Sequence, residues 1–450
     1  MAILKFVSDI NQAFTLFCVL PGILLVGLYL SIKLKFLQIS KLRLSAKMLM
    51  VKNKASSGVT QYQALSTVIA GNLGTGNISG MAIALTTGGP GALVWMWVMA
   101  FFGATIQYAS CVLGVKYRRS DKAGLPLAGP MYYLKDGLGL KKTGIIFAFF
   151  TLIAALTVGN FAQINSIVLP LASLGIDPLL SGILMTLLVA AVTLGGVERL
   201  GKVAASVVPI MAVIYLASAL IVLSCYHQNI IPAFTRMIAL AFSGSALFGG
   251  FLGFGAFKAL QVGFERGVFA TDAGTGIAPI LQASARSEHP VIDGLVTLVA
   301  PLIVMIICTT TGLVLMVTGA DEQNGIQSTN MVVYAFSQVW GSKIGSLIVI
   351  ACLAFFAYTT VIAWGCCAEK AANFLWGQNR AKWFQYLYLL LIPFGAIARV
   401  ELVWVLADLS ISWMLLTNLV GVVGLSSEVV EETDAYFAQE RIEKLTNKES

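Results

Sequence analysis

The chain has 450 residues, of which 58% are hydrophobic and 11% are charged, and its formal net charge is +8. Soluble domains carry about 25% charged residues, so this composition excludes an ordinary soluble protein and indicates a membrane protein with many spans. The basic residues are dispersed through short segments, which argues against a nucleic-acid-binding surface. The seven cysteines lie mostly in apolar stretches without zinc-site spacing, so we expect buried thiols and no transition-metal site.

Eleven apolar stretches are long enough to cross a bilayer as helices. They lie near residues 14–32, 60–86, 91–116, 143–170, 177–197, 203–224, 240–264, 291–318, 343–366, 383–399 and 402–424. Because such spans share one interior, we expect a single transmembrane domain over residues 1–425. The first stretch has no cleavage site behind it and is predicted to be a retained helix. Residues 426–450 alternate acidic and basic residues, which predicts a solvated helix or a frayed tail.

Most of the 29 Lys and Arg residues fall in alternate loops and in the C-terminal tail. Loops rich in Lys and Arg stay on the cytoplasmic side of a membrane. The distribution therefore predicts a multi-pass protein of the cell membrane, with its N-terminus outside and its C-terminus in the cytoplasm.

The second apolar stretch contains a small, polar, glycine-rich segment at residues 70–77. An unpaired backbone N–H or C=O group is costly in hydrocarbon, so irregular chain is tolerated there where it is buried in protein or lines a polar cavity. Interrupted helices of this kind form the substrate and ion sites of secondary transporters. The alternative is that these glycines serve close packing between helices.

Without the first helix, the ten remaining spans divide into two sets of five, in residues 55–224 and 239–425, whose first members start on opposite sides of the membrane. This arrangement predicts an inverted repeat in which each half opens with an interrupted helix. The glycine-rich segment 249–255 is the predicted second break.

Gly274-Thr275-Gly276 repeats Gly74-Thr75-Gly76 and is a competing candidate for the second break. A span that included it would also contain Glu265, Arg266 and Asp272, and each central charge costs about 2.5–3.5 kcal/mol. We therefore interpret this repeat as a coincidence or a cytoplasmic motif.

Further motifs run along the chain. They are Gly74–Ile78, Gly88–Ala92, Trp95–Trp97, Gly129–Tyr133, Asn160–Ser166, Arg266–Phe269, Ala273–Pro279, His289–Pro290, Phe355–Thr360, Leu402–Trp404 and Ala407–Asp408. In residues and in order they resemble the alanine or glycine:cation symporter family over nearly the whole chain. The resemblance implies an all-α polytopic protein of the leucine-transporter type, with five plus five inverted helices, one extra N-terminal helix, and sodium-coupled transport of small neutral amino acids.

The chain departs from the family pattern at two places. Asn72-Leu73 stands where the family usually has Arg-Val, and Ala270-Thr271-Asp272 stands where it usually has Ser-Asn-Glu.

Substrate-binding residues are predicted around the first break. The half-helix after Asn77 presents free backbone N–H groups, which favour a carboxylate. Gly74 and Gly76 allow the backbone to approach a ligand, and Thr75 adds a hydroxyl. Gln163 is predicted to face the substrate amine, with bonding between helices as the alternative.

Phe251 and Phe254 flank the predicted second break. They are candidates for the apolar wall of a pocket for a small side chain, or for ordinary packing. Asp408 is a carboxylate inside a span, for which proton coupling and the capping of a local bend are both open. Glu265 and Arg266 are expected to form an ion pair at the membrane boundary.

Sodium-binding residues are predicted at the end of the first half-helix and on a later span. Carbonyl groups near Gly71 and Leu73 point toward the break, and Phe356, Thr359 and Thr360 bring a carbonyl and two hydroxyls to one helical face. The resemblance implies a sodium ion between these two elements. The alternative is that the threonine hydroxyls bond to their own helix.

We predict a secondary active symporter that couples sodium influx to the uptake of alanine or glycine by alternating access. Its expected partners are the amino acid, the sodium ion and the bilayer, without nucleic acid, and sodium is the coupling ion with no other cofactor. No constellation of His, Cys and acidic residues indicates an enzyme. A proton-coupled or broader-specificity transporter and an amino-acid-sensing membrane protein or channel are the alternatives.

Overall fold

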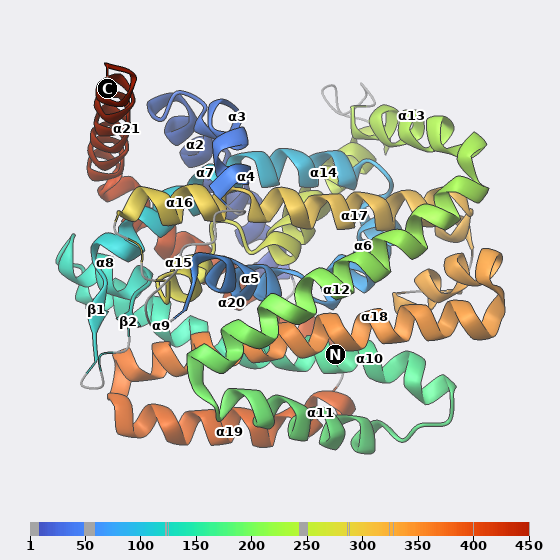
Figure 1. The fold of residues 1–450 in the computed structure, drawn as a ribbon. Helices are drawn as coiled ribbons and strands as arrows, with labels where there is room; N and C mark the ends of the chain where they lie inside the picture. Colours follow the sequence, from blue (N-terminus) through green and yellow to red (C-terminus); the bar gives the residue numbers. More distant parts are fainter. Residues whose placement is uncertain are drawn as a thin grey trace.

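The computed structural model describes residues 9–48, 59–121, 124, 126–242, 251–285, 287, 289–323, 325–326, 328–398 and 400–449. In these residues the protein is a bundle of helices, and one antiparallel pair of short strands is its only sheet (Figure 1).

Helices of very different length follow one another along the chain. In chain order the elements are η1 (Thr15–Val19), α2 (Leu20–Lys33), α3 (Leu37–Ser40), α4 (Leu42–Met48), α5 (Gln61–Asn72), η2 (Thr75–Asn77), α6 (Ser79–Gly88), α7 (Ala92–Lys116), β1 (Arg119–Ser120), β2 (Pro126–Leu127), α8 (Pro130–Asp136), α9 (Lys141–Leu156), η3 (Thr157–Phe161), α10 (Ala162–Ser173), α11 (Pro178–Thr193), α12 (Gly196–Cys225), η4 (His227–Asn229), α13 (Ile230–Ala241), α14 (Phe251–Thr271), α15 (Ile277–Gln282), α16 (Pro290–Leu298), α17 (Ala300–Val317), η6 (Ala320–Glu322), α18 (Thr329–Trp376), α19 (Gln378–Ile397), α20 (Val400–Gly424) and α21 (Ser426–Glu449).

Seven helical segments in the described part of the chain are long and apolar enough to cross a membrane. They are Asp9–Lys33, Ala92–Lys116, Lys141–Ala172, Gly196–Cys225, Pro290–Val317, Thr329–Trp376 and Leu402–Gly424. The four other predicted stretches correspond to α5 with α6, α11, α14 and α19. The structure therefore confirms an all-α polytopic membrane protein, while the number of eleven spans stays a prediction.

The interior and the outer surface of the bundle are both apolar. Helix α7 packs against α14, α16 and α17, and α18 packs against α9, α12 and α19, so α7 and α18 lie centrally. On the outside, large apolar side chains such as Leu187, Val213 and Leu390 are 63%, 66% and 65% exposed. Helices with apolar residues on all sides are typical of a membrane bundle, because lipid covers the outer face.

Several helices are irregular where they pass the centre of the bundle. α5 and α6 are separated by a short irregular segment, and so are α14 and α15. The helix formed by α9 and α10 contains the π-helical turn η3. Away from the centre, α18 is kinked at the exposed residue Gly341, whose φ is 74°. π-helical turns inside α-helices are frequent at functional sites.

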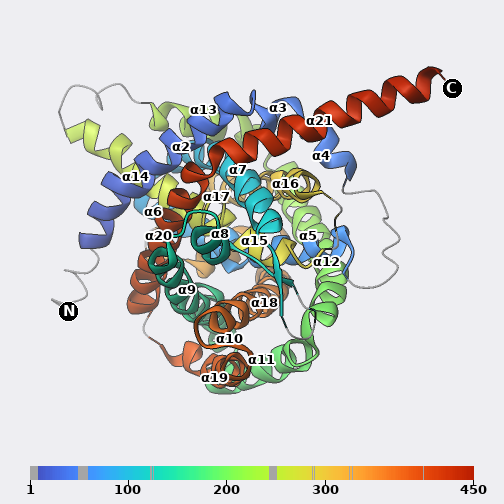
Figure 2. The same cartoon turned by 90° about the vertical axis from the view of Figure 1, so that its left-hand side faces the viewer.

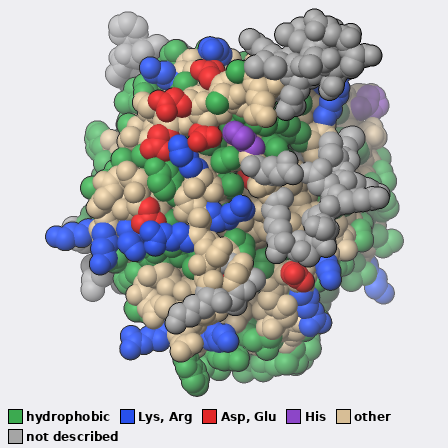
Figure 3. Space-filling model, turned by 60° about the vertical axis from the view of Figure 1, so that its left-hand side comes forward, with side chains coloured by type: hydrophobic (Ala, Val, Ile, Leu, Met, Phe, Trp, Pro, Cys, Tyr) green, Lys and Arg blue, Asp and Glu red, His purple; other side chains and the backbone are tan. Residues whose placement is uncertain are grey.

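One end of the bundle carries α8, the two strands and the C-terminal helix α21. Figure 2 views this end, and α21 projects beyond the bundle. The first turns of α21 are anchored to the end of α7, because Lys116 Nζ lies 2.8 Å from Glu428 and 3.1 Å from Glu432. Figure 3 shows that Lys and Arg side chains are spread over this end. The C-terminal segment is thus a helix with defined contacts over its first turns.

Candidate substrate and ion site

The first predicted interruption is present between α5 and α6. Helix α5 begins after Thr60, whose side chain forms a capping box with Gln63, and it ends at Asn72. Leu73 and Gly74 leave the helical conformation, the 3-10 turn η2 follows, and α6 begins at Ser79. All residues from 70 to 80 are buried. The prediction of an interrupted helix at residues 70–77 is confirmed.

Gln163 fills the space beside this first break. Its Oε1 accepts hydrogen bonds from the backbone N–H of Thr75 at 2.8 Å and from the Thr75 hydroxyl at 3.0 Å. Its Nε2 donates to the carbonyl of Val158, in the π-helical turn η3, at 2.9 Å. A Cβ atom on Gly74 would lie 2.8 Å from Gln163 Oε1, so glycine is needed for this approach. The Gln163 side chain therefore accepts a hydrogen bond from the N–H group at which we predicted that the substrate carboxylate binds.

Asn77 stabilises the irregular backbone of the break. Its Nδ2 donates to the carbonyls of Asn72 and Gly74 at 2.8 and 3.1 Å, and its Oδ1 accepts from Cys308 Sγ at 3.0 Å. The Asn77 carbonyl accepts from the Thr311 hydroxyl at 3.0 Å. These bonds satisfy backbone carbonyls that the interruption leaves without helical partners. The side chain predicted to bind substrate is engaged within the protein.

Thr360 connects α18 to the end of α5. Its hydroxyl donates to the carbonyl of Ala70 at 2.9 Å. A Cβ on Gly74 would lie 3.1 Å from the Thr360 hydroxyl oxygen. The Thr359 hydroxyl instead donates to the carbonyls of Phe355 and Phe356 on its own helix, at 3.0 and 3.1 Å. The structure thus brings Thr360, but not the Thr359 hydroxyl, to the break.

The remaining predicted ion ligands lie around the same helices. A Cβ on Gly71 would contact the side chains of Leu281 and Ala363 at 3.4 and 3.6 Å, so Gly71 lies between α15 and α18. Leu73 is fully buried in the break. Phe356 is also fully buried, with its ring centroid 5.8 Å from that of Tyr215 on α12.

The second interruption lies at residues 272–276 rather than at 249–255. Helix α14 runs without a break from Phe251 to Thr271, and α15 begins at Ile277. Asp272, Gly274 and Gly276 have φ values of 49°, 85° and 89°, a left-handed conformation that glycine adopts readily. The repeat that we interpreted as a coincidence or a cytoplasmic motif is therefore the second break. Residues 249–250 of the predicted break lie outside the described residues.

Phe251 and Phe254 do not flank the observed second break. Their side chains lie outside the described residues, but both belong to the first turn of α14. The twenty residues between Phe251 and Thr271 rise by about 30 Å, so these phenylalanines lie a full helix length away. Phe269, which a Cβ on Gly76 would meet at 2.8 Å, and Trp404 form a ring pair beside the first break, with centroids 4.7 Å apart. The ring of Phe147 lies beside Gly276 of the second break.

Asp408 and Arg266 form an ion pair between α20 and α14. Arg266 Nη2 lies 2.6 Å from Asp408 Oδ2, and the guanidinium lies 5.5 and 5.1 Å from the ring centroids of Phe269 and Trp404. Glu265, the predicted partner of Arg266, accepts instead from Gln261 at 3.1 Å. The pairing explains how α14 tolerates the charge that led us to reject this span, because a paired charge costs less than an isolated one.

The two breaks cross and contact each other. Asn72 Nδ2, at the end of α5, donates to the carbonyl of Thr271, at the end of α14, at 2.7 Å. Asn418 on α20 donates to the carbonyl of Gly274 at 2.8 Å and accepts from the hydroxyl of Tyr133. The irregular backbone of both helices is thus held in one buried polar cluster at the centre of the bundle.

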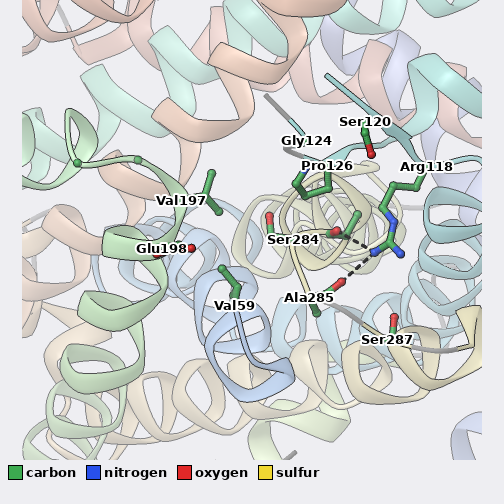
Figure 4. Close-up of a pocket in the computed structure, with 13 residues that line it drawn as sticks. Val59, Arg118, Ser120, Gly124, Pro126, Val197, Glu198, Ser284, Ala285 and Ser287 are labelled. Atoms are coloured by element: carbon green, nitrogen blue, oxygen red, sulfur yellow. Dashed lines mark hydrogen bonds between the residues drawn. The ribbon is translucent and has the colours of Figure 1, made fainter. Parts of the chain in front are cut away.

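Two cavities lie on opposite ends of the first interrupted helix. The Arg118 cavity, of about 650 Å³, is lined by Val59 just before α5 and by Arg118, Glu198 and Ser284 (Figure 4). The Arg266 cavity, of about 790 Å³, is lined by Thr86 near the end of α6 and by Arg266 and Trp404, among others. The crossing of the breaks lies between them.

Hydrogen bonds and rings separate the crossing from each cavity. On the side of the Arg118 cavity, Lys370 Nζ on α18 donates to the Ile280 carbonyl at 2.8 Å and to Ser284 Oγ at 3.0 Å. Arg118 donates to the carbonyl of Ala285 at 2.8 Å, as Figure 4 shows. On the side of the Arg266 cavity, Arg266 and Trp404 line the cavity, and a Cβ on Gly76 would lie 2.8 Å from the ring of Phe269. The residues of both breaks are buried, so the crossing is shielded from solvent on both sides.

A sequence model of the sodium:alanine symporter family matches residues 1–450. The chain belongs to this family. It is 40% identical over 420 residues to the sodium/alanine symporter AgcS of Methanococcus maripaludis, covering 91% of this chain and 92% of that protein. It is 31% identical over 432 residues to a probable sodium/glutamine symporter, GlnT, of Bacillus subtilis, covering 93% of this chain and 87% of that protein.

A solved structure shows that this symporter has the leucine-transporter fold. The crystal structure of MhsT in complex with L-phenylalanine superimposes with a TM-score of 0.60 at 13% identity, covering 83% of this chain and 91% of that chain. At this identity the likeness concerns the fold alone. It confirms the predicted leucine-transporter type of fold, while the number of helices and the two halves stay predictions.

Sequence reasoning missed several residues of this symporter's central cluster. Asn72, Asp272 and Asn418 contribute polar groups at the breaks, and Phe269 and Trp404 form the ring pair. The offset of 200 residues between the two Gly-Thr-Gly segments is the signal that could have located the second break. We rejected this segment from the sequence because of the charges on α14, and the partner of Arg266 is Asp408 on α20, far away in sequence.

Proposed function

We propose that the protein is a sodium-coupled symporter that imports a small neutral amino acid, alanine or glycine first, across the cell membrane. The observation that carries the proposal is the crossing of two interrupted helices, which is shielded from solvent and lies between two cavities. Sites of this kind, at the interface of two repeats, are where secondary transporters bind substrate and coupling ion. Membership of the sodium:alanine symporter family supports the ion and the substrate class.

The first break supplies the groups for the substrate carboxylate. Backbone N–H groups at the start of a helical segment favour an anion. The backbone N–H and the hydroxyl of Thr75 both donate to Gln163 Oε1. A substrate carboxylate could take the place of this oxygen as the acceptor, and neither buried donor would be left unpaired. In this proposal Gln163 holds the site while it lacks substrate and then moves aside, rather than binding the amine.

The ion is assigned to the space between the end of α5 and Thr360. Hard cations prefer oxygen ligands, and the Ala70 carbonyl and the Thr360 hydroxyl lie 2.9 Å apart. When an ion binds, both oxygens can turn toward it in place of their mutual hydrogen bond. Gly71, Leu73 and the carbonyl of Phe356 remain candidate ligands.

Alternating access then requires the two closures to open in turn. The ion pair between Arg266 and Asp408, with the rings of Phe269 and Trp404, is assigned to the external gate. Lys370, which holds α15 by two hydrogen bonds, is assigned to the internal gate. Ligands drive such a cycle when they bind one conformation more tightly than the others.

The orientation follows from the positive-inside bias. Lys116 and Arg119 lie at the end of the bundle that carries the Arg118 cavity, which we assign to the cytoplasm together with the C-terminus. We propose one transmembrane domain over residues 1–425, with halves at 55–224 and 239–425, and a cytoplasmic segment at 426–450. The proposal involves transport and assigns no chemical reaction to the protein.

Uptake of radiolabelled alanine into proteoliposomes, with and without an inward sodium gradient, tests the function. Accumulation that depends on the gradient is expected, with glycine competing better than glutamine. Uptake driven by a pH gradient without sodium would favour proton coupling, and binding without counterflow would favour a sensor. Either result would replace the proposed function.

A pair of neighbouring threonines tests the ion site. Thr360→Val removes the hydroxyl at the Ala70 carbonyl, whereas Thr359→Val removes one that bonds to its own helix. Thr360→Val is expected to raise the sodium concentration for half-maximal uptake by about tenfold, since such an interaction contributes about 1.5 kcal/mol. Thr359→Val serves as the matched control. Equal effects of the two substitutions would exclude this ion site.

A further inference from the structure

A short basic segment, residues 33–48, follows the first membrane helix at the end of the bundle that we assign to the cytoplasm. It contains no acidic residue and five basic ones, which are Lys33, Lys35, Lys41, Arg43 and Lys47. The segment forms α3 and α4, and Figure 2 shows both at the edge of the bundle end that carries α21. The proposed transport mechanism gives this basic segment no role.

The turn from α2 into the basic segment has a defined structure. Lys35 and Phe36 have φ values of 55° and 49°, a left-handed conformation that residues other than glycine adopt at an energetic cost. The N–H of Phe36 donates to the carbonyl of Ser31 at 2.6 Å, and the buried Gln38 Nε2 donates to Ser31 Oγ at 2.7 Å. These bonds hold α3 in a fixed direction on the end of α2.

The basic segment continues the apolar outer surface of α2. Leu25 and Ile32 are 68% and 60% exposed, and they lie two helical turns apart on one face of α2. Beyond the turn, Phe36 and Ile39 are 40% and 64% exposed. Exposed apolar side chains among basic ones, directly after a membrane span, are typical of a helix that lies in the interface between lipid and water.

Arg43 and Lys47 on α4 are exposed and have no acidic partner. They lie four residues apart, so they share one side of the helix, where like charges repel each other. Within the described residues no Asp or Glu forms an ion pair with either of them. Because Ser45 between them is buried and α4 packs against α16, a ligand can reach Arg43 and Lys47 from outside the bundle.

The other basic side chains beside α21 are engaged by that helix. Lys35 Nζ lies 3.5 Å from Asp434 Oδ1, and Lys41 Nζ lies 3.9 Å from the ring centroid of Phe437. The described acidic and aromatic groups of α21 thus serve the first part of the basic segment and leave Arg43 and Lys47 for a partner outside the chain.

We propose that the basic segment binds the headgroup of an anionic phospholipid in the cytoplasmic leaflet. In this proposal Arg43 and Lys47 donate to the phosphate, and Phe36 and Ile39 contact the upper part of the acyl chains. The cytoplasmic leaflet is negatively charged and attracts basic segments next to membrane helices, and Arg and Lys both bind phosphate oxygens. The inference goes beyond the proposed transport and is independent of which amino acid and which ion the protein carries.

Native mass spectrometry of the full-length protein in detergent tests the lipid site. The protein is titrated with phosphatidylglycerol and with phosphatidylcholine of the same acyl chains, and the wild type is expected to bind phosphatidylglycerol more tightly. The double variant Arg43→Gln/Lys47→Gln is expected to weaken phosphatidylglycerol about 25-fold, since each charge near an anionic membrane surface contributes about fivefold. Binding of phosphatidylcholine is expected to stay unchanged. The unfolding temperature verifies that the variant is folded.

A matched double variant removes the same charges elsewhere at this end of the bundle. Arg380 and Lys382 are exposed at the start of α19, next to Gln378, which donates to Asp121 just after β1. Arg380→Gln/Lys382→Gln is expected to leave the affinity for phosphatidylglycerol nearly unchanged. Equal losses in the two double variants would show attraction by net charge alone and would overturn the site.

Soluble anions distinguish a lipid site from a site for free phosphate. Inorganic phosphate and glycerophosphoglycerol, at an ionic strength matched with sodium chloride, are expected not to displace phosphatidylglycerol, because they lack acyl chains. Ile39→Asn is expected to weaken phosphatidylglycerol by about threefold or more, because the variant loses apolar area that lipid covers. Displacement by either soluble anion, or equal affinity of the wild type for the two lipids, would overturn the proposal.

Discussion

The ion pair between Arg266 and Asp408 allows a quantitative prediction. Two unit charges about 4 Å apart attract by about 4 kcal/mol at an effective dielectric constant of about 20. The side chains are 8% and 18% exposed, so removing one partner leaves the other charge largely buried. Breaking a buried pair costs about 3–5 kcal/mol, and the adjacent cavity favours the lower end of this range. We expect Asp408→Asn to lower the free energy of unfolding by about 3 kcal/mol.

The opposite substitution, Arg266→Gln, is expected to cost less. An arginine stays charged in a protein, whereas an unpaired aspartate can take up a proton and become neutral. In the double variant neither charge remains, so we expect it to regain more than half of the loss caused by Asp408→Asn alone. Reversible unfolding in mixed detergent micelles, over a range of sodium dodecyl sulfate fractions, measures these free energies.

The control is the exposed ion pair of Lys35 with Asp434, whose side chains are 81% and 64% exposed. Exposed pairs contribute about 0–1 kcal/mol, so Lys35→Gln is expected to change stability little. If the losses of Arg266→Gln and Asp408→Asn simply add in the double variant, to within about 0.5 kcal/mol, the two charges are not coupled and the reasoning is refuted.

Three further predictions concern glycines and the C-terminal helix. Gly74→Ala places a Cβ 2.8 Å from the flexible Gln163 side chain, so we expect a folded protein with greatly reduced alanine binding, measured by thermal stabilisation. Gly276→Ala forces a Cβ to 2.4 Å from Pro130 at a φ of 89°, so we expect a loss of stability of about 2 kcal/mol or more, seen in unfolding experiments. Lys116→Gln removes both ion pairs to α21, so we expect faster proteolysis of the C-terminal segment at unchanged global stability, measured by limited digestion.

The membrane class and the first break follow from local sequence. Long apolar stretches have few alternatives to membrane helices, because lipid-exposed backbone must satisfy its own hydrogen bonds. The glycines at 74 and 76 weaken the helix locally, which is why an interruption could be predicted within residues 70–77. Hydrogen bonds from the distant residues Gln163 and Thr311 then hold the irregular backbone. The number of spans was harder to infer, since α11 and α19 carry apolar stretches that sequence alone does not separate from buried helices.

The second break was misplaced because its energetics are tertiary. Counting charges along the chain made a span through Glu265, Arg266 and Asp272 unfavourable. In the structure Arg266 is neutralised by Asp408, which is 142 residues away in sequence. A break in the glycine-rich segment 249–255 would have placed none of these charges in the span. Helix α14 is nevertheless continuous from Phe251 to Thr271.

The same distinction applies to the site residues. Local sequence is enough to identify Thr75, Gln163 and Thr360 as polar groups in apolar spans, where each needs a partner. The folded bundle selects those partners: Gln163 bonds to Thr75, and Thr360 to Ala70, while Thr359 turns back to its own helix. Side-chain partners across a bundle depend on how helices rotate and cross, and no local pattern fixes that rotation. The crossing of the two breaks exists only in the folded protein.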